Sequence, residues 1–399
     1  MTDKDAKESV VAAGKRLVES GLIARTWGNV SCRISESHFA ITPSGRDYMS
    51  LTPDEIVTVA ILDCSYSGNI KPSSEKGIHA DVYKHDPDIN FVIHTHQDNA
   101  SVISTLGLDS IKPGFTNKLL GDEIICASYG LPGTKKLRDG VSDALQRSKG
   151  NAVIMKNHGA VCFGKDAEEA FKVATELEHV CDGFIVDQYL KISQMKSFEP
   201  DKLRQFALSR LARRTETLDY EMPRPYCNSE RTRNGFKLYI KNGETVNVRF
   251  GELGGELPKE VEIHNEIYLK NTNINYIIHA DTPDILTVSR ANITLYPLID
   301  DFAQIAGTKV KTVLNDPSII AAALKSASAV FIVNNGAFCC GAFEGDASAV
   351  NIIMEKNCKA FIGGTICGRV KPISWLDSKL MRFVYVKKYS KQISDGKMK

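Results

Sequence analysis

The sequence predicts a duplicated α/β protein in which one folding unit occurs twice. Residues 78–104 match residues 263–289 without a gap, at an offset of 263 − 78 = 185 positions. Residues 151–164 match residues 328–341 in the same way. Each copy contains a helical pattern, two apolar strands and a helix rich in Ala and Glu, so the repeat is larger than the unit of a short solenoid.

The composition is that of an ordinary soluble globular protein. Of the 399 residues, 43% are hydrophobic and 25% are charged, and the length suffices for two cores. A formal net charge of +2 gives no support for nucleic acid or an anionic membrane as the main partner. Apolar runs are too short for a transmembrane helix, a signal-peptide pattern is missing, and the ten cysteines are dispersed. We therefore expect reduced thiols and a cytoplasmic location.

The elements of the first copy follow in chain order. A helical pattern begins after Glu75 and places its apolar residues on one side. The apolar run 91–93 predicts a buried strand, on which His94 and His96 point to the same face because side chains alternate along a strand. A second apolar strand ends at His158 and a glycine turn.

Three imidazoles and one carboxylate form a plausible four-ligand zinc site. The pair His94 and His96 often arises by chance and alone is also explained as two hydrogen-bonded residues at a strand end, whereas His158 and Glu75 favour the metal. If one ligand leaves, the metal gains an open position for Lewis-acid chemistry.

The second copy differs where this chemistry would occur. The four candidate ligands correspond there to Glu260, His279, Asp281 and Asn335, so two of the three imidazoles are replaced. Pro258-Lys259 also replaces the two serines before the glutamate. We expect this copy to be degenerate and structural.

A predicted helix over Asp201–Thr217 and an irregular, proline-containing stretch over 221–230 separate the copies. The predicted division is a metal-binding catalytic domain over 1–197, a helix and connector over 198–235, and a degenerate domain over 236–399.

The first copy resembles the class II aldolase/adducin family over roughly residues 8–195. The motifs that carry the resemblance are Thr26-Trp-Gly28-Asn29-Val-Ser31, Ile41-Thr-Pro-Ser44-Gly45, Pro72-Ser73-Ser74-Glu75, His94-Thr-His96 and Asn157-His158-Gly159. The resemblance implies a three-layer α/β/α domain with a mostly antiparallel central sheet, present twice. It also implies a homodimer of tandem chains that forms a pseudo-tetramer.

By the same resemblance, His94, His96 and His158 hold Zn²⁺ or another divalent transition metal. Glu75 completes the resting site and acts as the catalytic acid or base when substrate displaces it. Cleavage of a C–C bond beside a carbonyl leaves an enediolate, which a chelating divalent ion stabilises without a Schiff-base lysine. We expect a zinc-dependent aldehyde-lyase that cleaves or forms a small ketose phosphate by retro-aldol chemistry.

Several other activities remain open. Glutamate at position 75 favours an aldolase over an epimerase, but sugar-phosphate dehydratases and decarboxylases of the family also use glutamate. A non-catalytic, adducin-like scaffold is the alternative from another class, although such proteins lack the ligands that are present here. Phe115 stands where the aldolase pattern has a proton-donating tyrosine, for which Tyr129 or Tyr48 is a possible substitute.

Three pairs of small residues on turns match the positions at which family members bind the substrate phosphate. Each pair alone is better explained as a turn or a helix N-cap, and the three together favour a phosphate site. The predicted phosphate ligands are Gly28, Asn29, Ser44, Gly45, Ser73 and Ser74. The expected partner is thus a small phosphorylated sugar. With neither a P-loop nor a dinucleotide fingerprint, we expect neither NTP nor NAD.

His79 lies four residues after Glu75, on the same face of the predicted helix. It is either a partner of the site or a packing residue, and the second copy retains His264 at this position.

Overall fold

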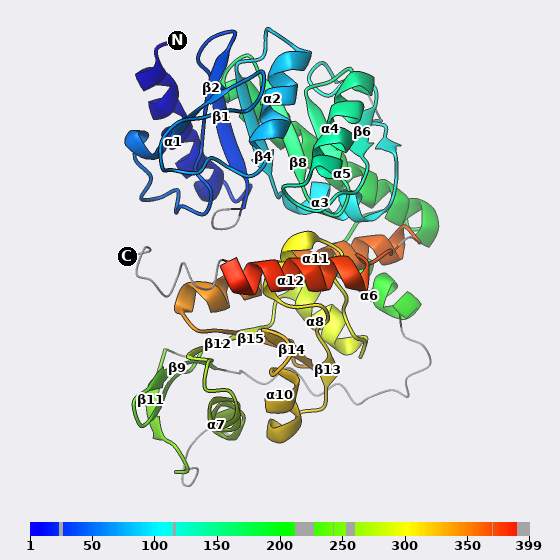
Figure 1. The fold of residues 1–399 in the computed structure, drawn as a ribbon. Coiled ribbons are helices and arrows are strands. Elements are labelled where there is room, and N and C mark those ends of the chain that lie inside the picture. The colour runs from blue at the N-terminus through cyan, green and yellow to red at the C-terminus, as the bar shows by residue number, and fades with distance from the viewer. Residues whose placement is uncertain are drawn as a thin grey trace. The chain divides into compact units, whose positions relative to one another are not determined.

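The computed structural model describes residues 1–23, 27–114, 117–211, 227–241, 243–252, 260–368 and 370–388. The chain divides into two compact units, residues 1–191 and 192–388, each built on its own sheet. Figure 1 shows the two units and their elements. In these described ranges, no helix combines the length and apolar character needed to cross a bilayer.

The first unit contains an eight-stranded sheet in the order β3-β2-β1-β4-β8-β7-β6-β5. All neighbouring strands are antiparallel except β6 and β7. Its elements are α1 (Asp3–Glu19), β1 (Asn29–Arg33), β2 (His38–Ile41), the 3₁₀ helix η1 (Pro53–Glu55), β3 (Val57–Ala60), α2 (Lys76–His85), β4 (Phe91–Thr95), α3 (Asp98–Thr105), β5 (Ser110–Ile111), β6 (Ile124–Ala127), α4 (Lys135–Arg147), β7 (Ala152–Met155), β8 (Ala160–Gly164) and α5 (Ala167–Ser193).

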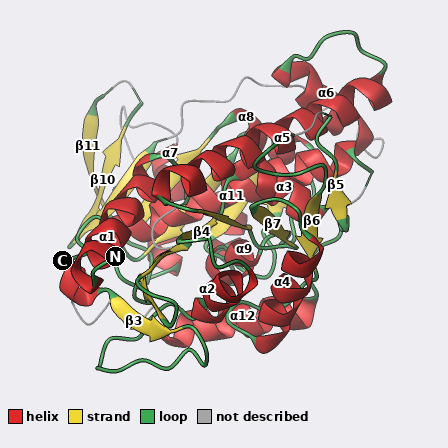
Figure 2. Ribbon diagram, turned by 90° about the horizontal axis from the view of Figure 1, so that it is seen from above, coloured by secondary structure: helices red, strands yellow, loops and turns green. Residues whose placement is uncertain are grey.

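Helices cover this sheet on both faces (Figure 2). Helices α2 and α4 pack on one face, where Ile78 and Val141 join a buried cluster that includes Val92 of β4. Helices α1 and α3 contact strands of the sheet. Helix α5 is tied to α3 because the Glu178 carboxylate accepts hydrogen bonds from the first backbone amides of α3.

The second unit repeats this strand order with seven strands, β11-β10-β9-β12-β15-β14-β13. Only β13 and β14 are parallel among the pairs described. Its elements are α6 (Pro200–Leu211), β9 (Asn228–Thr232), β10 (Gly235–Tyr239), β11 (Thr245–Arg249), α7 (Glu260–Lys270), β12 (Tyr276–Ala280), α8 (Pro283–Arg290), α9 (Asp300–Ile305), β13 (Thr312–Val313), α10 (Pro317–Ala323), β14 (Ala329–Ile332), β15 (Ala337–Gly341), α11 (Glu344–Ile366) and α12 (Trp375–Lys388).

The range assigned by sequence to a helix and connector contains α6 and also β9, the first strand of the second sheet. The predicted helix over Asp201–Thr217 is described as far as Leu211. Its last six residues and positions 221–226 of the irregular stretch lie outside the described residues.

Matched side-chain contacts support the duplication. The guanidinium of Arg33 on β1 donates to the backbone carbonyl oxygens of Ile89, Tyr83 and Asp86. Arg231 on β9 makes the same three bonds to Ile274, Tyr268 and Asn271. Each partner differs by 185 positions between the units, so the two copies share their internal packing as well as their strand order.

Candidate metal centre

Three chain segments bring the candidate ligands together in the first unit. His94 lies on β4, where it pairs in register with Asn29 of β1 and Val161 of β8. His158 occupies the turn between β7 and β8, and Glu75 immediately precedes α2. Strand β4 ends at Thr95, so His96 follows the strand rather than continuing it as the sequence suggested.

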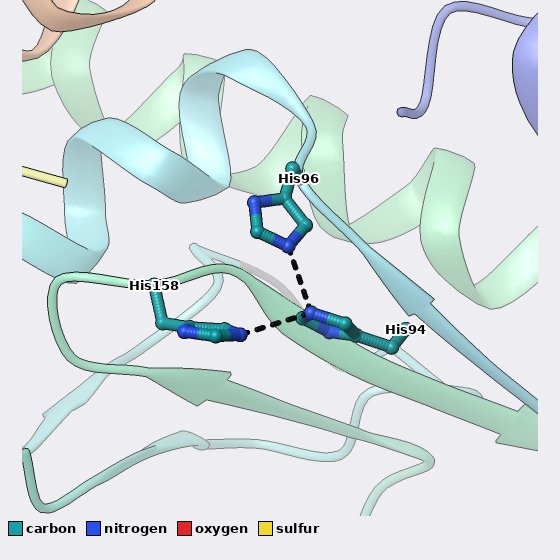
Figure 3. A group of neighbouring side chains, drawn as sticks. All are labelled: His94, His96 and His158. Atoms are coloured by element: carbon teal, nitrogen blue, oxygen red, sulfur yellow. Dashed lines mark hydrogen bonds between the residues drawn. The ribbon is translucent and has the colours of Figure 1, made fainter. Parts of the chain in front are cut away.

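The three imidazole rings converge on one point (Figure 3). The Nε2 atom of His94 lies 2.8 Å from Nε2 of His96 and 3.0 Å from Nε2 of His158. All three side chains are buried. These nitrogens form a group that can hold a metal ion.

The Glu75 carboxylate completes the group. Its Oε1 lies 3.2 Å from Nε2 of His158, and its Oε2 lies 3.5 Å from Nε2 of His94. The side-chain Nδ2 of Asn29 donates a hydrogen bond of 3.1 Å to the same Oε2. The carboxylate is therefore held between two imidazoles and an amide.

Hydrogen bonding fixes which nitrogen of His94 carries the lone pair. Its Nδ1 lies 3.0 Å from the carbonyl oxygen of Ala160, and because a carbonyl only accepts, Nδ1 must carry the proton. Burial lowers the pKa of His94 to about 3, despite the neighbouring carboxylate of Glu75, so the ring is neutral. Its Nε2 is then unprotonated and directed at the other ligands, which is the state that metal binding requires.

The charge of Glu75 also suits a cation. Burial would raise the pKa of its carboxyl, but the neighbouring imidazoles of His94 and His158 and the hydrogen bond from Asn29 hold that pKa well below its usual range. The carboxylate is thus ionised beside the neutral ring of His94.

The spacing of these atoms fits a small tetrahedral ion. Zinc–nitrogen bonds of about 2.0–2.1 Å place neighbouring ligand atoms about 3.3 Å apart in a tetrahedron. The four separations given above range from 2.8 to 3.5 Å around that value. Three imidazole nitrogens and one carboxylate are also the donor types that zinc prefers.

Two glycines permit the close packing around His94. Gly28 has a φ of +123°, and a Cβ there would lie 2.6 Å from the carbonyl oxygen of His94. A Cβ on Gly159 would overlap the Thr95 carbonyl oxygen and lie 3.1 Å from Cε1 of the His94 ring. Glycine at these positions therefore lets the start of β1 approach the backbone of His94 and lets the β7–β8 turn approach its ring.

The turns predicted to bind phosphate lie side by side. The backbone amide of Ser44 donates to the carbonyl of Lys71, and the amide of Ser73 donates to the carbonyl of Thr42. The third turn contains Gly28 and is joined to the other two through Tyr48. The Tyr48 hydroxyl donates to the carbonyl of Gly28 and contacts the Thr42 hydroxyl.

The exposed members of these turns are Ser44, Gly45 and Ser74. Ser73 is buried instead, and its hydroxyl accepts a hydrogen bond from the Glu75 amide. Thr26, which begins the first of these motifs, lies outside the described residues.

The side-chain amide of Asn29, a predicted phosphate ligand, is hydrogen-bonded within the first unit. Its Nδ2 is bonded to Glu75, and its Oδ1 is hydrogen-bonded to Nε2 of His79. Both ends of the amide are therefore engaged inside the unit. Sequence reasoning missed this contact because the partners are 46 and 50 positions away along the chain.

The possible proton donors have different surroundings. Tyr48 is buried, its hydroxyl is bonded to the Gly28 carbonyl, and burial raises its pKa. This engagement disfavours Tyr48 as a donor to substrate. The hydroxyl of Tyr129 is buried, with a lysine side chain, Lys136, over the ring. Phe115 lies outside the described residues.

The second unit arranges its corresponding residues differently. Nε2 of His279, which corresponds to His94, lies 2.7 Å from the backbone carbonyl oxygen of Asn335 and so donates to it. Asp281, which replaces His96, forms an ion pair with Lys241. Pro258 and Lys259 lie outside the described residues. In this unit the imidazole nitrogen that would face a metal is engaged with the backbone.

The fold and these motifs define a family. The class II aldolase and adducin N-terminal domain matches residues 8–185 and 232–362, so the chain belongs to that family and contains two matching regions. The predicted resemblance and fold class are thereby confirmed.

Individual relatives are aldolases and a decarboxylase. A 5-deoxy-D-ribulose 1-phosphate aldolase of Bacillus thuringiensis serovar kurstaki is 33% identical over 202 residues, which are 50% of this chain and 93% of the relative. A 3-oxo-tetronate 4-phosphate decarboxylase of Haemophilus influenzae is 27% identical over 206 residues, covering 50% of this chain and 96% of the relative. The solved structure of an L-fuculose 1-phosphate aldolase is 29% identical, covers 50% of this chain and 92% of its own, and has a TM-score of 0.44.

Proposed function

We propose that the first unit is a metal-dependent aldolase acting on a small ketose 1-phosphate. The observation that carries this proposal is the convergence of three imidazole Nε2 atoms and one ionised carboxylate in a buried site. His94, His96 and His158 would hold a divalent ion, zinc by preference, and Glu75 would be its fourth ligand. The relative that acts on 5-deoxy-D-ribulose 1-phosphate supports the substrate class.

A bound divalent ion supplies Lewis acidity toward a carbonyl oxygen and a neighbouring hydroxyl oxygen of the substrate. Cleavage breaks the bond between the carbon beside the carbonyl and the next carbinol carbon. The carbinol hydroxyl loses its proton and becomes an aldehyde, while the other carbon gains a proton. The products are dihydroxyacetone phosphate and an aldehyde.

Glu75 is suited to the proton transfer at the carbon beside the carbonyl. Its carboxylate is ionised and lies beside two imidazoles, so it can accept or donate a proton there once substrate has displaced it. Asn29 keeps one carboxylate oxygen in place through its hydrogen bond. The burial of all four side chains limits access of water to this proton.

The substrate phosphate is assigned to the adjoining turns. Ser44, Gly45 and Ser74 offer hydroxyl and backbone amide groups, and Gly28 and Ser73 shape the same surface. We leave the Asn29 side chain out of this set, because both of its polar atoms are engaged by other residues.

The test is an assay of zinc-loaded protein against a panel of ketose 1-phosphates that includes 5-deoxy-D-ribulose 1-phosphate. Dihydroxyacetone phosphate is measured as the product. We expect release with the wild-type chain and with His279→Ala, and loss of release with His96→Ala. The proposal fails if His96→Ala retains wild-type activity, or if zinc-loaded protein releases no triose phosphate from any member of the panel.

Decarboxylation is the second candidate function. One relative decarboxylates 3-oxo-tetronate 4-phosphate, a reaction that also leaves negative charge beside a carbonyl. Carbon dioxide release from that substrate, without triose phosphate release from the ketose panel, would assign this reaction instead.

A further inference from the structure

A chain of hydrogen bonds runs behind Glu75 into the core of the first unit. Asn29 links Glu75 to Nε2 of His79, which lies one helical turn after Glu75 on α2 and has no exposed surface. Nδ1 of His79 lies 2.6 Å from the hydroxyl of Ser31, and that hydroxyl lies 2.7 Å from the hydroxyl of Tyr83. The chain of bonds therefore includes both nitrogens of one buried imidazole.

The chemistry of the groups fixes the direction of every bond. An amide nitrogen only donates, so Nδ2 of Asn29 donates to Oε2 of Glu75, and Oδ1 of the same amide is an acceptor. Nε2 of His79 must then carry the proton that bonds to this Oδ1. Nδ1 of the neutral ring is an acceptor and takes the Ser31 hydroxyl proton, while Tyr83 donates to Ser31. Donation therefore runs from Tyr83 to Glu75 without a break.

The second unit contains only part of this arrangement among its described residues. The hydroxyl of Ser229 lies 2.6 Å from Nδ1 of His264 and 2.8 Å from the hydroxyl of Tyr268, as in the first unit. Cys227 stands where the first unit has Asn29. Nε2 of His264 has no hydrogen-bond partner in the described part of the chain.

This comparison separates two roles of the same imidazole. The serine, histidine and tyrosine contacts occur in both units, so they belong to the packing of the fold. The link from the imidazole to a carboxylate accompanies the complete ligand set of the first unit. A histidine retained for packing alone would not require Asn29 to face Glu75.

We propose that His79 is a positioning residue that sets the orientation of the Asn29 amide and thereby holds Glu75 in the metal site. Without its proton, Nε2 would be an acceptor that competes with Glu75 for Nδ2 of Asn29, and an amide turned by half a turn toward it would present its oxygen to the carboxylate. Two acceptors would then face each other, and Glu75 would leave its place beside His94 and His158. The proposal rests on the proposed function only in taking Glu75 as a metal ligand and proton carrier.

Two substitutions of His79 test its two ring nitrogens separately. In His79→Gln the longer side chain places its amide nitrogen near the position of Nε2, so it can still donate to Asn29. In His79→Asn the shorter side chain reaches only the position of Nδ1, so it keeps Ser31 and loses Asn29. His264→Gln and His264→Asn are the matched controls in the second unit.

The readouts are zinc affinity, measured by competition with a chromophoric chelator, and the visible spectrum of the cobalt-loaded protein. We expect His79→Asn to weaken zinc binding by about 10–100-fold, and His79→Gln to stay within about threefold of wild type. With the substrate found for the wild-type chain, kcat follows the same order and KM stays constant. The cobalt spectrum of His79→Asn changes because Glu75 leaves the coordination sphere. Both His264 variants match wild type in every readout.

Zinc affinity and cobalt spectra of His79→Asn equal to those of His264→Asn would overturn the proposal. A second measurement needs no variant to fold. Nitrogen-15 chemical shifts of the histidines in the metal-free wild-type protein report which ring nitrogen is protonated. A proton on Nε2 of His79 supports the proposal, and a proton on Nδ1 overturns it. Neither zinc binding nor this tautomer depends on the substrate, so failure of the aldolase assay is distinguishable from failure of the positioning role.

Discussion

The substitution His158→Asn tests the metal centre most directly, because it gives the first unit the residue that the second unit carries. The turn itself tolerates asparagine. Asn157, immediately before His158, has a φ of +59°, and Asn334, immediately before Asn335, has a φ of +62°. The two turns share this backbone conformation, so the variant is expected to fold and to lose only the imidazole.

The expected magnitude follows from the number of ligands. A four-ligand zinc site in a small folded domain binds with about 10–16 kcal/mol, so one ligand contributes about 2.5–4 kcal/mol. At about 1.4 kcal/mol per tenfold change in affinity, the loss of His158 weakens zinc binding by about two to three orders of magnitude. Glu75 also loses the imidazole nitrogen that lies 3.2 Å from its Oε1, so the remaining ligands are held less firmly.

Zinc affinity is measured by competition with a chromophoric chelator, and bound zinc is counted after dialysis. The matched control is His279→Asn, which removes the imidazole at the position of the second unit that corresponds to His94. We expect that control to bind zinc as the wild-type chain does. The reasoning is refuted if His158→Asn binds zinc as tightly as wild type, or if His279→Asn weakens binding equally.

Three further predictions concern acid–base chemistry, packing and pH. Glu75→Gln keeps the three imidazoles but removes the proton carrier, so kcat of the variant saturated with zinc falls by about 10²–10⁴-fold, and a kcat within tenfold of wild type would contradict this. Gly28→Ala combines a positive φ with a Cβ 2.6 Å from the His94 carbonyl oxygen, and it lowers the free energy of unfolding in urea by about 2–6 kcal/mol. Gly68→Ala, with a φ of +94° and open space around the new Cβ, lowers the free energy of unfolding by only about 1–3 kcal/mol. Equal losses of stability in the two variants would refute the clash expected at Gly28. Burial lowers the pKa of His264 from 6.5 to about 3, so between these two pH values only the unfolded metal-free chain takes up this proton. Stability then falls by about 1.4 kcal/mol per pH unit for this residue, and unchanged pH dependence in His264→Gln would rule that out.

The sequence alone determined the repeat, the fold class and the identity of the candidate ligands. The repeat is visible because residues that fill the core or shape a turn are retained at the offset of 185, as with Tyr83 and Tyr268. The ligand types are visible because cysteine, histidine and the carboxylates are the side chains that bind zinc, so motifs that contain His94, His96 and His158 stand out. A site whose chemistry requires only a few residue types can therefore be predicted from the sequence without coordinates.

The relation between the first strands of the two sheets was not visible in the sequence. Ser31 on β1 and Ser229 on β9 hold equivalent positions, but their offset is 229 − 31 = 198 rather than 185. The offset changes between these first strands and the helices that follow them. The first strands therefore do not belong to the long ungapped match between the two copies. The replacement of Asn29 by Cys227 was therefore recognised only from the shared contacts of His79 and His264.

Tertiary structure alone decided which groups the side chains of Asn29 and His79 contact. The motif around Asn29 suggested a phosphate ligand, but strand β1 places its amide between a carboxylate and an imidazole that both belong to the segment around α2. The direction of each hydrogen bond depends on which donor and acceptor atoms distant segments bring within 3.5 Å. Residue types specify which ligands are available, whereas the packing of β1 against α2 and β4 specifies how they are oriented.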